Sequence, residues 1–177
     1  MKSKIALILI PFCISMVLLS CGPTSENAKK YDDELVDQLT KVYKKEALLI
    51  EAISKKSPEK LDTLYANFTK QIKLSTTEIT NMSTFDGKTD LRDAALRVLY
   101  NYTDVVGNEY SQIVTLAKIP VSLYTPEDDD KKIQLSKDID QKINKANDEF
   151  KELERGFISK YKIELFSNVK DTAQGKK

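Results

Sequence analysis

The sulfur chemistry available to this chain is confined to one short segment. Both cysteines, Cys13 and Cys21, lie in the apolar stretch LILIPFCISMVLLSCG, and the 177 residues include no histidine. A cysteine thiolate is a nucleophile that can form disulfides, bind metals or accept a covalent group. Which of these reactions applies depends on the residues around each cysteine.

The flanks of this stretch indicate a signal peptide. Residues 1–4 carry two lysines, and residues 5–19 are apolar apart from Pro11 and Ser15. Such a run is shorter than the roughly 20 apolar residues of a membrane-spanning helix and fits a signal peptide. It ends in Leu18-Leu19-Ser20-Cys21, which resembles the lipobox of bacterial lipoproteins. We therefore expect cleavage after Ser20 and lipidation of Cys21, for example with palmitate. The alternatives are an ordinary secretory signal or an apolar anchor with a chance cysteine.

Lipidation would leave the mature chain without a free thiol. Cys13 would leave with the signal peptide and Cys21 would carry lipid, so disulfides, thiol catalysis and common zinc sites are excluded. The lack of histidine excludes Ser-His triads and the Glu-x-x-His ligands of di-iron bundles. Only carboxylate chemistry remains, and no acidic pair is evidently placed for it. We expect no catalytic residue, no cofactor and no metal.

The charge balance gives no reason to expect nucleic-acid binding. Removal of Lys2 and Lys4 leaves 26 basic and 27 acidic residues, a net charge of about −1. Binding to phosphate backbones depends on a surplus of lysine and arginine, which this chain lacks.

Apolar residues recur at alternating steps of three and four along four segments, which predicts amphipathic helices. We expect helices over 27–55, from Ser57-Pro58-Glu59 to residue 82, from Asp90 to residue 119, and from Thr125-Pro126 to residue 165. Ser57 and Thr125 are expected N-caps. The expected fold is all-α. It is an antiparallel four-helix bundle over 31–166, preceded by the signal peptide 1–20 and a lipidated tether 21–30, and followed by a flexible tail 167–177.

Two acidic residues occupy core-spaced positions. Glu46 and Glu109 lie about nine residues before the ends of the first and third expected helices, so they should fall at one level of the bundle. Buried carboxylates must be paired, protonated or solvated, or must turn outward. One possibility is that one or both face solvent while Ala47, Ile50 or Ile113 fill the core. The other is a polar layer that fixes helix register, bonded to groups such as Tyr65, Tyr102, Ser136 or Lys137.

A glycine inside the last expected helix is also unusual. Gly156 costs about 1 kcal/mol relative to alanine in a helix. In an antiparallel bundle it lies near the loop 83–88. We therefore predict that Phe85 packs over this part of the helix and uses the space that the missing side chain leaves.

The segment FDGKTDLRDAALRVLYNYTDVVGNEYSQIV resembles the signature stretch of a family of helical surface lipoproteins in spirochaetes and Bacteroidetes. The matching residues are Phe85, Gly87, Leu91-Arg92-Asp93-Ala94-Ala95-Leu96, Asn108-Glu109-Tyr110 and Lys160-Tyr161. The resemblance implies a four-helix lipoprotein at the cell surface. It implies no biochemical activity, because none is settled for the family.

The expected function is that of a non-enzymatic binding or structural module, attached by lipid to the bacterial outer membrane. Gly22, rather than aspartate, follows the expected lipid site, which permits outer-membrane sorting by resemblance to the enterobacterial rule. The cell surface and the periplasmic face both remain open. The expected partners are the membrane and an unidentified envelope or extracellular protein. The alternatives are a carboxylate-based or metal-dependent enzyme on a bundle, and an envelope assembly factor.

Overall fold

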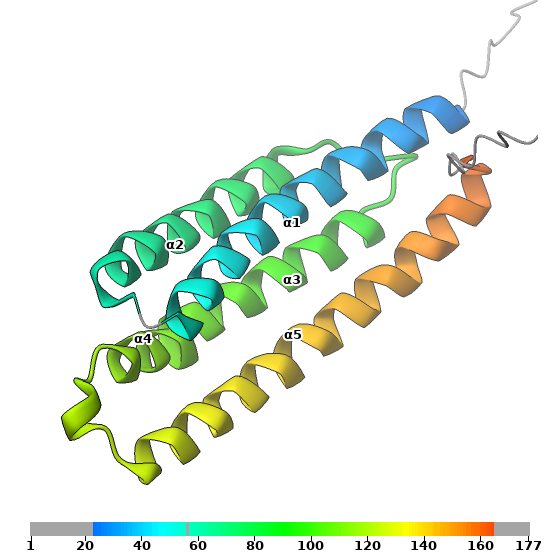
Figure 1. Ribbon diagram of the computed structural model, residues 1–177. Coiled ribbons are helices and arrows are strands. Elements are labelled where there is room, and N and C mark those ends of the chain that lie inside the picture. The colour runs from blue at the N-terminus through cyan, green and yellow to red at the C-terminus, as the bar shows by residue number, and fades with distance from the viewer. Residues whose placement is uncertain (1–22, 56, 165–177) are drawn as a thin grey trace, which may run out of the picture.

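The computed structural model describes residues 23–55 and 57–164 (Figure 1). Its elements are α1 (Ser25–Ser54), α2 (Pro58–Asn81), α3 (Asp90–Val105), the π-helical turn η1 (Val106–Tyr110), α4 (Ser111–Ala117), the 3₁₀ turn η2 (Val121–Leu123) and α5 (Pro126–Tyr161). Because α3, η1 and α4 follow one another without a break, they form one long helix. The expected all-α four-helix bundle is confirmed. The signal peptide, Cys21 and the expected tail lie outside the described residues.

Neighbouring helices of the bundle run in opposite directions along a common long axis (Figure 1). The main contacts are between α1 and α2, between α3 and α5, and between α2 and α3. The apolar stripes of all four helices meet in one core. Its largest fully buried apolar side chains are Tyr102, Phe68, Leu35, Leu49, Leu61, Ile72, Ile79 and Leu99. No helix of the described residues is both long and apolar enough for a membrane span.

The first helix starts earlier than the sequence indicates. The Thr24 side chain accepts a hydrogen bond of 3.1 Å from the backbone N–H of Asn27, which caps a helix that begins at Ser25. Ala28 is fully buried, so this first turn already packs against the bundle. Residues 25–30, assigned above to the tether, are therefore helical.

The two expected N-caps differ. The Thr125 side chain accepts from the Asp128 N–H, and the Asp128 carboxylate accepts from the Thr125 N–H, a complete capping box. Ser57 makes no such side-chain bond, although Pro58 follows it as expected. Ser57 is therefore the N-cap residue of α2 as expected, but without a side-chain capping bond the start of this helix depends on the proline and on packing.

The start of α1, the α2–α3 loop and the end of α5 lie together at one end of the bundle (Figure 1). The Ser25 hydroxyl donates to the Lys162 carbonyl oxygen at 3.0 Å, joining the first and last helices. In the loop, Phe85 and Lys88 exchange two backbone hydrogen bonds across a tight turn, with Asp86 and Gly87 in the left-handed region. Glycine adopts that conformation without steric cost. We call this end, from which the chain continues toward Cys21, the basal end.

Phe85 packs on α5 as predicted. Its ring centroid lies 5.4 Å from that of Phe157 and 5.1 Å from that of Tyr161. It does not fill the space beside Gly156, because a Cβ atom built there would meet no other atom within 4 Å. The second part of the prediction was wrong, since the aromatic rings pack on one another and leave this position open.

Candidate binding site

Glu46 on α1 turns into the bundle and binds two tyrosines of the long third helix. Its Oε2 accepts a hydrogen bond of 2.7 Å from the Tyr102 hydroxyl, and its Oε1 accepts one of 2.6 Å from Tyr110. Phe68 packs edge-on against both tyrosine rings. Glu46 is only partly exposed to solvent, and its carboxylate is thus satisfied at both oxygens by protein donors.

Burial raises the pKa of Glu46, and the hydrogen bonds from Tyr110 and Tyr102 act in the opposite direction. Burial and the nearby Glu46 charge raise the pKa of both tyrosines far above its usual range. The two phenols therefore stay protonated and remain donors. The chemical result is a fixed polar contact inside the core, which we call the Glu46 centre.

The structure separates the other candidates from this centre. Ala47 and Ile50 are exposed, so neither replaces Glu46 in the core. Tyr65 donates instead to the Val106 carbonyl oxygen at 2.8 Å. Ser136 and Lys137 are exposed, and neither bonds to either acid.

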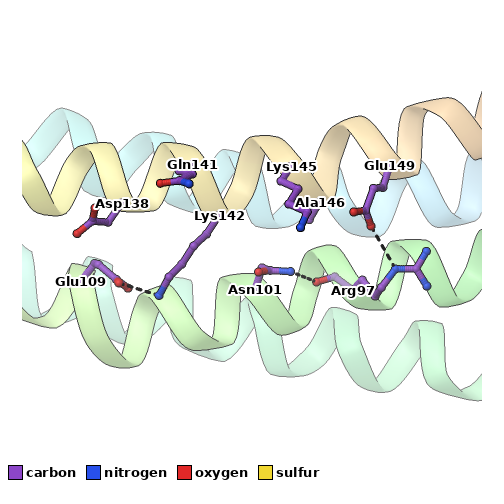
Figure 2. A pocket seen from close by; sticks show the side chains of 9 residues that line it. All are labelled: Arg97, Asn101, Glu109, Asp138, Gln141, Lys142, Lys145, Ala146 and Glu149. Carbon is purple, nitrogen blue, oxygen red and sulfur yellow. Dashed lines mark hydrogen bonds and ion pairs between the residues drawn. The ribbon is translucent and has the colours of Figure 1, made fainter.

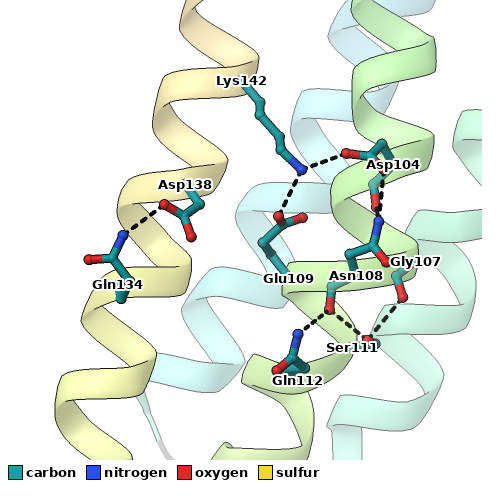
Figure 3. Close-up of polar contacts among 9 residues, drawn as sticks. All are labelled: Asp104, Gly107, Asn108, Glu109, Ser111, Gln112, Gln134, Asp138 and Lys142. Carbon is teal, nitrogen blue, oxygen red and sulfur yellow. Dashed lines mark hydrogen bonds and ion pairs between the residues drawn. The ribbon is translucent and has the colours of Figure 1, made fainter.

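Glu109 belongs to a second polar group, on the side of α5. It is buried, with 8% of its surface exposed. Its Oε1 accepts from the Lys142 ammonium at 2.8 Å, and Lys142 also donates to Asp104 at 2.6 Å (Figure 3). The hydrogen bonds to Asp104 and Glu109 raise the pKa of Lys142, so it remains charged. Among the described residues Glu109 Oε2 has no partner.

The two acids are therefore at one level but not in one network. Tyr110, which binds Glu46, directly follows Glu109, so both groups meet the same turn of η1. No hydrogen bond between the described residues links Glu46 to Glu109. Of the two possibilities left open by the sequence, neither holds as stated: both acids face inward, but they belong to two separate polar groups on either side of the third helix.

The π-helical turn explains this arrangement. Each π-type hydrogen bond spans one more residue than an α-helical bond, so some carbonyl groups lose their usual partner. Side chains replace them: Tyr65 binds the Val106 oxygen, and the Ser111 hydroxyl binds the oxygens of Gly107 at 3.1 Å and Asn108 at 2.8 Å (Figure 3). Within this turn Val106, Glu109 and Tyr110 are buried.

Beside this turn, a polar groove of about 510 Å³ lies along the surface where α3 and η1 meet α5 (Figure 2). Its lining residues are Arg97, Asn101, Glu109, Asp138, Gln141, Lys142, Lys145, Ala146 and Glu149. Arg97 and Glu149 lie opposite each other with 3.6 Å between guanidinium and carboxylate. Three cations and three carboxylates share this surface, which we call the α3–α5 groove. Such a lining suits a polar ligand that carries both charge signs.

A second accessible surface lies at the end of the bundle opposite the basal end. Two adjoining pockets of about 270 Å³ each share Ile53 and Lys132 in their walls. Close to them in the chain, Val121 and Leu123 on η2 are 76% and 68% exposed, and Ile133 on α5 is also exposed. We call this apolar surface the distal patch.

The sequence identified Glu46 and Tyr102 as candidates but did not identify the other residues that bond to Glu46 or to Glu109. Lys142 and Asp104 carry no motif, and Tyr110 entered only as part of the matching stretch Asn108-Glu109-Tyr110, with no role assigned to it. The one sequence signal that could have pointed to Tyr110 is that it directly follows Glu109, which occupies a core-spaced position. In the described part of the chain, no group of three or more acidic residues is close enough together to hold a metal ion.

No family model, curated protein or solved structure matches this chain. The fold and the geometry above therefore carry the functional inference.

Proposed function

We propose that this protein is a non-enzymatic binding module, attached to the bacterial outer membrane by lipid on Cys21. The sequence Leu18-Leu19-Ser20-Cys21 and its flanks support the anchor, as does the resemblance of the segment from Phe85 onward to surface lipoproteins. In the proposed arrangement, the basal end lies next to the membrane, because Ser25 follows Cys21 by four residues.

The observation that carries the binding role is the α3–α5 groove. It is bounded by helices, and most of its charged residues are already held by contacts: Lys142 with Glu109, Arg97 with Glu149, and Asp138 with Gln134. A preorganised polar surface reduces the entropy lost on binding. The groove takes a partner protein segment with both acidic and basic side chains, since each sign finds a counter-charge there.

The anchor is tested by metabolic labelling with a palmitate analogue. The wild-type chain should label and partition with membranes, and Cys21→Ala should lose both properties. Cys13→Ala is the matched control, because it lies in the same apolar stretch but leaves with the signal peptide. Labelling of the Cys21→Ala variant would contradict the anchor.

The groove is tested separately in intact cells by a photo-reactive residue at Gln141, inside the groove, and at Glu78 on the exposed face of α2. A defined cross-linked partner should appear only from position 141. The charge reversal Lys145→Glu should reduce that product at least fivefold, while Lys73→Glu on α2 should not. Equal products from both positions would contradict a role for the groove.

The distal patch favours a second candidate, an envelope assembly factor. Exposed apolar surface of this kind marks sites of protein association. Double substitution Val121→Ser with Leu123→Ser should then abolish partner capture and leave the groove product intact. If the double substitution instead leaves partner capture unchanged, the groove is supported as the binding site.

A further inference from the structure

A pocket of about 310 Å³ opens at the basal end between the start of α3 and the end of α5. Its apolar wall consists of Tyr31, Phe85, Leu91, Leu153, Phe157 and Tyr161, with Gly156 between them. The four aromatic rings form a continuous chain of contacts, with neighbouring centroids 4.7 to 6.0 Å apart. Ring-to-ring packing makes this wall rigid. The basal pocket is therefore preformed.

Gly156 has no explanation within the chain's own packing. It lies in the interior of α5, where glycine destabilises a helix relative to alanine. Its backbone is not in the left-handed region, and an added Cβ would meet no atom within 4 Å. Neither conformation nor close approach requires a glycine here. Because Gly156 has no side chain, the basal pocket stays open on the side of α5.

The basal pocket lies close to the expected lipid site. Ser25 is bonded to the carbonyl oxygen of Lys162, and Lys162 follows Tyr161, which lines the pocket. Cys21 precedes Ser25 by four residues, which span at most about 14 Å when extended. An acyl chain attached at Cys21 is thus within reach of the pocket without any rearrangement of the bundle.

The charges around the pocket leave its interior to an apolar occupant. The Lys160 ammonium is held by the Asp86 carboxylate at 2.9 Å and lies 4.4 Å from the centroid of the Tyr161 ring. Tyr161 also donates to Asp86, at 2.7 Å. These groups satisfy one another. Lys88, Asp90 and Glu152 also line the pocket, so the part of the lining that an apolar ligand can contact is the aromatic wall.

We propose that the basal pocket takes up one acyl chain of the lipid on Cys21. This inference rests on the lipid anchor of the proposed function. Bilayer hydrocarbon is as apolar as the pocket, so burial alone does not favour either location. Attachment four residues from Ser25 makes the binding intramolecular and gives the chain a high effective concentration at the pocket. One acyl chain in the pocket would fix the bundle relative to its anchor, while the others hold the membrane.

The experiment uses the full-length protein in cells supplied with a fatty acid that carries a diazirine in its chain. After irradiation, peptides are identified by mass spectrometry. The expected product joins the N-terminal lipopeptide to a peptide containing Phe85 or Phe157. Gly156→Leu fills the pocket and should reduce this product at least tenfold. Gly107→Ala is the matched control, because that helical glycine is equally open but lies outside the pocket, and it should leave the product unchanged.

Thermal unfolding checks that Gly156→Leu folds. If it does not, Gly156→Ala adds a single methyl group to the same wall and should reduce the product at least threefold. A labelled Cys21 with no cross-link to the pocket, an unchanged product in the folded Gly156 variant, or adducts of phospholipid alone would each overturn the proposal. Absence of label on Cys21 would instead refute the anchor itself, and the two failures are therefore distinguishable.

Discussion

Tyr110 on η1 donates a hydrogen bond of 2.6 Å to Glu46 on α1, across the interior of the bundle. With Tyr102 it satisfies both oxygens of a carboxylate that is largely withdrawn from solvent. The contact joins α1 to the one turn of the third helix that departs from α-helical geometry. It therefore couples the rotation of α1 to the position of the π-helical turn.

The first prediction concerns this Glu46 centre. Glu46→Ala should lower the free energy of unfolding by about 2–4 kcal/mol, because it leaves two buried phenol donors without partners. Chemical denaturation measures the change. Glu51→Ala, which changes an exposed residue paired only with Lys55, is the control and should leave stability almost unchanged. Equal effects of the two substitutions would show that the centre does not stabilise the bundle.

The second prediction is a pH dependence that originates at Asp32. This residue is buried, with 5% of its surface exposed, and burial together with the charges of Glu154 and Asp33 raises its pKa to about 6. The folded state thus holds the proton more tightly than the unfolded state. Its contribution to stability is complete below the unfolded pKa near 4 and is lost as the pH rises through 6.

Asp32→Asn should therefore stabilise the protein at pH 7.5 by about 1–3 kcal/mol and have little effect at pH 4. Urea unfolding at both pH values measures this difference. Asp37→Asn, which changes an exposed carboxylate paired with Lys41, is the control. A stabilisation by Asp32→Asn that is the same at both pH values would contradict the titration.

The third prediction concerns the lysine between two acids. Lys142→Met should destabilise the bundle by about 1–3 kcal/mol, because Glu109 would remain buried without its counter-charge. Lys118→Met is the control, since its partner Asp62 is exposed, and it should change stability by about 0.5 kcal/mol or less. Thermal unfolding compares the two. If they agree, Glu109 is stabilised by groups other than Lys142.

The fourth prediction contrasts two helix starts. Thr125→Ala should cost about 1 kcal/mol, because it removes one half of the capping box at α5. Ser57→Ala should have a clearly smaller effect, since Ser57 makes no side-chain capping bond at α2. Denaturant unfolding of the two variants decides the point, and a larger loss at Ser57 would contradict the assigned caps.

The fifth prediction contrasts two glycines. Gly87 adopts a φ of 66°, so Gly87→Ala should destabilise the protein by about 1 kcal/mol. Gly156→Ala should stabilise it by up to about 1 kcal/mol, because the helical position is open and alanine favours helix. Opposite signs in thermal unfolding are the expected result, and destabilisation by Gly156→Ala would show an unseen contact at that position.

The sequence was sufficient for the features that depend on periodicity. Apolar spacing predicted four helices, and signals such as Thr125-Pro126 predicted where α5 begins, because caps and prolines act locally. Core spacing also left open an inward position of Glu46 bonded to Tyr102, and the structure shows that contact. These features depend on residues within a few turns or on a shared level of a simple bundle.

The other contacts of the site depend on geometry that spacing does not encode. Core spacing singled out Glu109, but it gave no indication that Tyr110, the next residue, is also buried and bonds to Glu46. The pairing with Lys142 depends on how α5 is rotated about its axis. The open space at Gly156 depends on how four aromatic rings pack on one another, which no local pattern determines.

The π-helical turn also bears on how this chain should be compared with others. A π-type turn contains one more residue than the α-helix it interrupts, so a relative without it would be one residue shorter between Val105 and Ser111. An ungapped alignment across this point would match the buried face of α4 with residues about 100° away around the helix. A one-residue gap inside an otherwise unbroken helix is therefore the correct alignment for such a relative.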